Sequence, residues 1–147
     1  MELLAVFPPL FAFLIAFLGG RWIGDRGAQI VTCTGVCIAA AASVWLFMNV
    51  TLQQESYVNV LAPWIASGDF GVSWSLRVDT LSVVMMCVIN IVSSCVHIYS
   101  VGYMSHDDAQ ARFMSYLSLF TFAMLMLVSA DNILQLFFGW EGVGLAS

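Results

Sequence analysis

The sequence has 147 residues, of which 61% are hydrophobic and only 9% are charged. Soluble domains are about half apolar and a quarter charged, so this composition indicates a membrane protein. At about 20 residues per crossing, the length allows four or five membrane helices and excludes a soluble catalytic domain of useful size. There is no lysine, and the four basic residues are Arg21, Arg26, Arg77 and Arg112. Nucleic-acid binding needs clustered basic side chains, so that class of function is excluded as well.

The apolar runs predict an all-α polytopic membrane protein with four transmembrane helices and the start of a fifth. The expected spans are about 3–20, 30–50, 80–101, 113–130 and 132–147. The second is rich in small residues, which favours a place inside the bundle. The fourth is almost wholly apolar, and the fifth is too short to cross. Residues 1–147 are therefore interpreted as a single transmembrane region, an N-terminal fragment of a longer subunit.

Polar residues at the ends of the runs predict where the helices begin. Asp79 is expected to cap the third helix, with Ser82 three residues further on. Asp131 is expected in the capping position of the fifth helix. The Asp107-Asp108 pair is expected to cap the fourth.

A short β-hairpin is predicted at about 57–78, between the second and third helices. Residues 70–78 carry an apolar side chain at every second position, which is strand periodicity. Ser67-Gly68-Asp69 is prone to form a turn, and Tyr57 begins an earlier apolar run. Trp64 and Trp74 suit a hairpin lying against the membrane surface.

The arginines predict the orientation. The loops at 21–28 and 100–112 carry Arg21, Arg26 and Arg112, which places both loops on the cytoplasmic side or its equivalent. The hairpin then lies on the opposite side, although its Arg77 weakens the argument. We expect a multi-pass protein of the bacterial inner (plasma) membrane, with the mitochondrial inner membrane as the alternative.

Glu141 is the candidate functional residue. A helix that starts near Asn132 places Glu141 about 14 Å deep, at a rise of roughly 1.5 Å per residue. A carboxylate at that depth costs on the order of 3 kcal/mol on insertion scales, so it calls for a functional or a pairing role. We interpret it as a proton-relay acid; an ion pair that only joins helices is the alternative.

The surroundings of Glu141 leave two points open. All four arginines lie near the ends of spans, so the cation that this carboxylate needs is expected from residues outside this chain. Gly139, Gly142 and Gly144 flank it, either to admit water or simply to allow close packing of helices. His97, in the third span, is a second candidate for proton exchange. An interfacial histidine hydrogen-bonded to a neighbouring helix is an equally good interpretation.

No motif for a cofactor or a metal is present. The cysteines form no CxxC pair, and there is no dinucleotide-binding, phosphate-binding, iron-sulfur or haem pattern. Any electron transfer is expected to take place on partner chains.

Four segments in order carry a family resemblance: RVDTLS at 77–82, HIYSVGYM at 97–104, YLSLFTFAML at 116–125 and GWEGVGL at 139–145. Together they resemble the N-terminal part of the L subunit, an antiporter-like membrane-arm subunit of NADH-quinone oxidoreductase, respiratory complex I. The resemblance implies a subunit that translocates protons and has no redox site of its own. NADH, FMN, iron-sulfur clusters and quinone would be bound by partner subunits. Glu141 would match a family glutamate that pairs with a lysine on a later helix.

The expected partners are the other membrane-arm subunits of complex I, the lipid bilayer and protons. Two alternatives remain open: a subunit of an Mrp-type cation/proton antiporter, and a structural module that docks neighbouring subunits. The later elements of the family are absent from these 147 residues.

Overall fold

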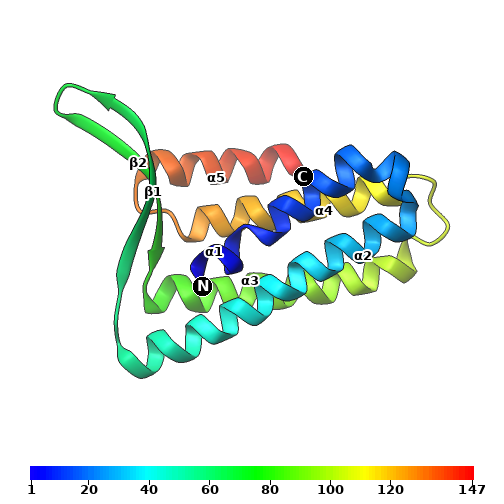
Figure 1. Ribbon diagram of the computed structural model, residues 1–147, viewed down its shortest axis with the longest axis horizontal. Coiled ribbons are helices and arrows are strands. Elements are labelled where there is room, and N and C mark those ends of the chain that lie inside the picture. The colour runs from blue at the N-terminus through cyan, green and yellow to red at the C-terminus, as the bar shows by residue number, and fades with distance from the viewer.

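The computed structural model describes residues 1–147 as a bundle of helices with a two-stranded β-hairpin across one end (Figure 1). Most of the chain is helical, as predicted. The elements in chain order are α1 (Glu2–Val6), α2 (Pro8–Gln53), β1 (Tyr57–Ser67), β2 (Phe70–Val78), α3 (Thr80–Tyr103), α4 (Gln110–Val128) and α5 (Ile133–Ala146).

Helix α2 contains most of the first two predicted spans, and it is sharply bent at Gly24. This residue has φ 74° and ψ 176°, a conformation that glycine adopts without strain. The chain reverses direction at the bend, so both arms of α2 extend from it toward the hairpin end of the bundle (Figure 1). They approach closely enough that a Cβ added to Gly35 would lie 2.8 Å from the Cβ of Ala12.

The predicted number of crossings is confirmed only in part. Three helices, α2, α3 and α4, are long and apolar enough to cross a membrane, and α5 is a shorter apolar helix. The prediction counted the two arms of α2 separately; in the structure they belong to one segment of 46 residues whose backbone is non-helical at Gly24.

The first predicted span is interrupted at Phe7, between α1 and α2. Pro9 has no N–H to donate to the carbonyl of Ala5 four residues earlier. Asn90 of α3 supplies the missing donor, since its Nδ2 lies 3.2 Å from the Ala5 oxygen. The same amide donates to Ser43 Oγ of α2 at 2.5 Å. Asn90 is fully buried, and these two hydrogen bonds join α3 to α1 and α2.

We predict that Asn90→Leu destabilises the bundle by about 1–3 kcal/mol, because it leaves the Ala5 carbonyl buried without a donor. The measurement is the thermal unfolding of the complete subunit in detergent. Asn49→Leu is the matched control, because Asn49 is only partly buried and its side chain bonds only to Trp45 of its own helix. Equal unfolding temperatures for the two variants would contradict this role of Asn90.

The predicted hairpin is confirmed. Strands β1 and β2 pair antiparallel from Tyr57 opposite Val78 to Ser67 opposite Phe70. The turn contains Gly68 with φ 60°. Two register shifts, near Leu61 and near Trp64, bend the hairpin, so that its tip projects beyond the bundle at the upper left of Figure 1.

The free edge of β2 is covered by the corner between α4 and α5. The side chain of Gln135 pairs with Ser75 as a third strand would: its Oε1 accepts from the Ser75 N–H at 3.0 Å, and its Nε2 donates to the Ser75 carbonyl at 2.7 Å. Asn132 donates to the carbonyl of Ser73 at 2.9 Å. The N–H of Arg77 donates to the carbonyl of Ser129 at 2.8 Å. Backbone groups that would otherwise be unpaired are therefore satisfied.

The helix caps confirm one prediction and correct two. Asp79 caps α3 by accepting from the N–H of Ser82 at 2.7 Å, and this bond, with the neighbouring Arg77 guanidinium, holds the pKa of Asp79 below its ordinary value. The cap of α5 is Asn132 and not Asp131, because the Asn132 side chain also reaches β2. The N-cap position of α4 is Ala109, so the predicted Asp107-Asp108 cap is wrong. The Asp107 carboxylate accepts a hydrogen bond from the N–H of Ala109, which lies before the helix.

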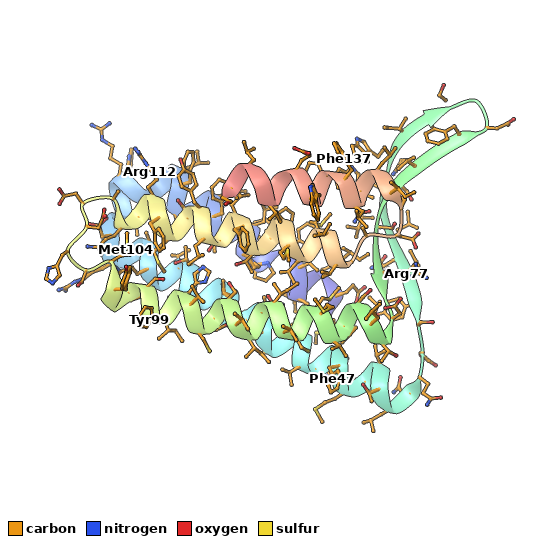
Figure 2. The ribbon with its side chains drawn as sticks, turned by 180° about the vertical axis from the view of Figure 1, so that it is seen from behind. Phe47, Arg77, Tyr99, Met104, Arg112 and Phe137 are labelled. Atoms are coloured by element: carbon orange, nitrogen blue, oxygen red, sulfur yellow. The ribbon has the colours of Figure 1, made fainter.

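The arginine-bearing loops gather at one end of the bundle, and the hairpin lies at the other. Gln29 of α2 donates to Gln110 of α4 at 2.6 Å, which joins the bend of α2 to the start of α4. Figure 2 shows Arg112 and Met104 at this end, and Arg77 on the hairpin at the opposite end. The grouping of Arg21, Arg26 and Arg112 is thus as expected.

Candidate functional site

Glu141 lies on the exposed side of α5. It is eight residues after Ile133, so it is about 12 Å along the helix from that end. Its side chain is exposed, and it forms no hydrogen bond or ion pair within the chain. The ion pairs in the structure involve only the N-terminus with Glu2 and Arg77 with Asp79.

The four arginines are far from Glu141 along the bundle. Gly142 packs beside Ala123 of α4, which is eleven residues from Arg112 and so about 17 Å away along the helix. Arg77 is on the hairpin, and Arg21 and Arg26 are at the bend of α2. At these positions none of the four arginines forms an ion pair with Glu141.

Close packing between α4 and α5 explains two of the three flanking glycines. A Cβ on Gly139 would lie 2.7 Å from the backbone nitrogen of Leu127, and one on Gly142 would lie 3.1 Å from the Cβ of Ala123. A Cβ on Gly144 would meet nothing within 4 Å. With Gly139 and Gly142 facing α4, Glu141 points away from that helix.

We predict that Gly139→Ala weakens the packing of α5 by about 1–3 kcal/mol, since the added methyl group collides with backbone that cannot move aside. The measurement is the unfolding temperature of the complete subunit and the amount of assembled complex. Gly144→Ala is the matched control on the same helix and is expected to have no such effect. Alanine favours the helix more than glycine does, so helix propensity would not lower the stability of either variant. A similar loss in both variants would therefore contradict a specific effect of the contact between Gly139 and α4.

His97 is completely buried between α3 and α4. Its Nδ1 lies 2.7 Å from the Ser93 carbonyl, and its Nε2 lies 3.2 Å from Ser118 Oγ of α4. The hydroxyl of Ser93 in turn lies 2.5 Å from that of Thr121. Both ring nitrogens have partners, which agrees with the interpretation of a histidine hydrogen-bonded to a neighbouring helix.

The structure does not bring His97 and Glu141 together. His97 contacts α4 from the side of α3, whereas Glu141 is on α5, which packs on α4 through Gly139 and Gly142. No chain of hydrogen bonds joins the two. Nor does any group of three histidine, cysteine or acidic side chains come close enough to hold a metal ion.

The sequence analysis missed the polar face of α4. The fourth span was predicted to be almost wholly apolar, yet it buries the hydroxyls of Ser115, Ser118 and Thr121. Their spacing of three residues places them on one side of the helix, and this was the available signal. It also missed Gln135, whose partner Ser75 is 60 positions away in the chain.

Comparisons with known proteins bear on the predicted resemblance. A family model described as NADH-ubiquinone oxidoreductase (complex I), chain 5 N-terminus, matches residues 64–114. NADH-ubiquinone oxidoreductase chain 5 of Chondrus crispus is 50% identical over all of this chain, which spans 22% of that relative. NADH-quinone oxidoreductase subunit L of Rhodobacter capsulatus is 45% identical, and the chain spans 21% of it. The resemblance to the chain 5 and subunit L family is confirmed.

The chain thus spans about a fifth of the length of these chain 5 and subunit L relatives. A protein named probable intron-encoded endonuclease 4, from Neurospora crassa, is also 43% identical over the whole chain, which spans 27% of it. Proteins with different names therefore contain segments similar to this chain.

Proposed function

We propose that this chain is part of a proton-translocating membrane-arm subunit of NADH-quinone oxidoreductase, in which Glu141 is a proton-relay acid. Redox chemistry takes place on other subunits of the complex, and this chain contributes no redox site. It acts in the bacterial inner membrane, or in the mitochondrial inner membrane, beside other membrane-arm subunits.

The observation that carries the proposal is an unpaired carboxylate on an apolar helix. A carboxylate in the bilayer costs on the order of 3 kcal/mol, so its presence there calls for a functional or a pairing role. Glu141 faces away from α4 and toward no cation of its own chain. A lysine on a segment outside these residues supplies the counter-charge, and its movement changes the affinity of Glu141 for a proton.

The same proposal assigns a crossing to each arm of α2. The bend at Gly24 and the loop between α3 and α4 then lie on one side of the membrane, with Arg21, Arg26 and Arg112. The hairpin lies along the opposite surface. This orientation follows the excess of arginine in the loops that face the cytoplasm or its equivalent.

We predict that Glu141→Gln in the complete complex preserves assembly and NADH oxidation by an artificial electron acceptor. Quinone-coupled proton pumping should fall at least tenfold, because the amide cannot ionise. The measurement is proton uptake by vesicles per NADH oxidised. Glu55→Gln is the control, since Glu55 is exposed in the loop before β1 and belongs to no proposed site.

Two outcomes separate the alternatives. Unchanged pumping by a fully assembled Glu141→Gln complex would contradict the relay role. Loss of assembly in that variant would favour the ion-pair interpretation, in which Glu141 only holds helices together.

We extend the proposal to His97 as a proton-exchange group. It lies six residues before the end of α3, about 9 Å from the arginine-bearing end. His97→Gln keeps a hydrogen-bonding side chain but cannot take up a proton. We expect the assembled variant to pump fewer protons per NADH oxidised, and the pH dependence of this pumping to change. If neither the pumping nor its pH dependence changes, His97 has only a structural role.

A further inference from the structure

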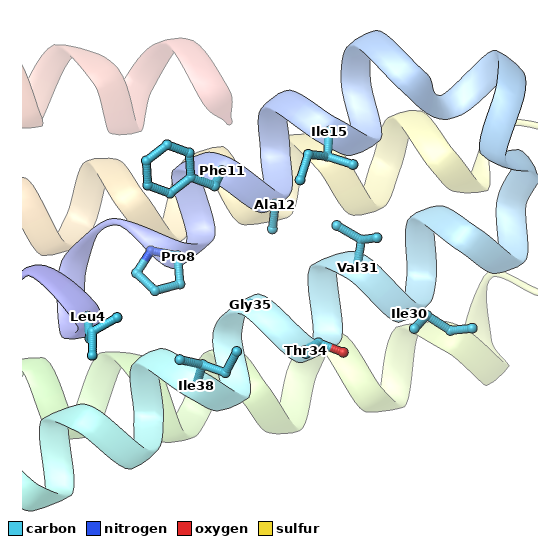
Figure 3. Close-up of a pocket in the computed structure, with 10 residues that line it drawn as sticks. All are labelled: Leu4, Pro8, Phe11, Ala12, Ile15, Ile30, Val31, Thr34, Gly35 and Ile38. Atoms are coloured by element: carbon cyan, nitrogen blue, oxygen red, sulfur yellow. The ribbon is translucent and has the colours of Figure 1, made fainter.

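An apolar groove runs between the two arms of α2. It has a volume of about 490 Å³ and is open on one side (Figure 3). Leu4, Phe11 and Ile15 line it from α1 and the first arm, and Ile30 and Ile38 line it from the second. The proposed function makes no use of this groove.

The floor of the groove is formed by the closest approach of the two arms. Gly35 has no side chain at this point, and a Cβ there would lie 2.8 Å from the Cβ of Ala12 and 3.0 Å from the carbonyl oxygen of Pro8. The larger side chains therefore stand along the walls and leave a slot between them.

A basic residue and an aromatic residue stand at the end of the groove next to the bend. Arg26 lies one turn before Ile30 and about 40° around the helix from it, at the edge of the face that lines the groove. The Arg26 side chain is exposed and forms no ion pair, even with the adjacent Asp25. Trp22 is 92% exposed at the same bend.

From this arrangement we infer that the groove binds one acyl chain of a phospholipid whose phosphate is held by Arg26. Ile30 to Ile38 span about 12 Å, and Arg26 lies about 6 Å before them. One leaflet of a bilayer has a hydrocarbon depth of about 15 Å, so the slot matches the chain of a lipid whose headgroup is level with Arg26. Trp22 stands at the same level, where amphipathic aromatic rings are favoured.

A second apolar hollow, between α2 and α3, provides the comparison. Val44, Phe47, Val84 and Ile91 line it, and no charged side chain does. It is apolar like the groove but has no group to hold a phosphate. A lipid there is expected to exchange freely with the bilayer, so that it is lost on purification.

The test counts phospholipids retained by the complete complex, purified in mild detergent and washed with lipid-free detergent, by native mass spectrometry. Thr34→Trp fills the slot, and Arg26→Gln removes the cation without changing the slot. Val44→Trp fills the second hollow, and Arg21→Gln removes an arginine of the same bend that does not lie one turn before Ile30. Each variant is first checked for assembly by its intact mass.

We expect Thr34→Trp and Arg26→Gln to retain one phospholipid fewer than the wild type, and the two controls to retain the full number. Added phosphatidylglycerol should restore the lost lipid to Arg26→Gln only at higher concentration, and not to Thr34→Trp. Equal numbers in all variants would overturn the site, as would a loss common to both arginine variants. The lipid count does not depend on proton pumping, so it succeeds or fails independently of the role of Glu141.

Discussion

The free edge of strand β2 is the constraint on which the placement of helix α5 depends. A two-stranded hairpin leaves one row of backbone N–H and C=O groups without partners, and burial of such groups is costly. The Gln135 side chain bonds to both the N–H and the carbonyl of Ser75. The carbonyl of Ser129 accepts from the N–H of Arg77, and the Asn132 amide donates to the carbonyl of Ser73. Because Asn132 and Gln135 are the cap and the first turn of α5, the same bonds that close the hairpin set the start of that helix.

The direction of α5 then determines where Glu141 lies. Helix α5 begins next to β2 and runs alongside α4, and Gly139 and Gly142 allow the backbones of the two helices to approach closely. Glu141 is between these glycines in the sequence but on another side of the helix. Its carboxylate is thus presented away from the rest of the chain, where a partner segment can reach it.

Interruptions in the first part of the chain shape the other side of the bundle. Pro9 ends α1 and leaves the carbonyl of Ala5 to Asn90. Gly24 reverses α2, and Gly35 allows the returning arm to approach the first. A break of this kind needs a side-chain donor from elsewhere, since the bilayer offers no water to an orphaned carbonyl. The slot beside Gly35 is a consequence of the same reversal.

Much of this could be predicted from the sequence, for local reasons. The apolar runs, the strand alternation of 70–78 and the Asp79 cap depend on neighbouring residues, and the structure agrees with them. The prominence of Glu141 followed from its place in an apolar run, and the distance of every arginine from it followed from their places between runs. The count of crossings is confirmed only in part, because the first two apolar runs lie in one segment, α2, which bends sharply where Gly24 has a positive φ.

The remaining features needed the tertiary structure, because they join residues far apart in the chain. Gln135 with Ser75, Asn90 with Ala5 and His97 with Ser118 are hydrogen bonds across 60, 85 and 21 positions. Asn132 replaces Asp131 as the cap of α5 because only Asn132 can also donate an N–H to β2. The sequence by itself determined which segments are apolar and which residue in them is a costly charge, since both depend on residue type alone. Only the tertiary structure decided which buried polar groups satisfy one another, because that depends on which segments are brought side by side.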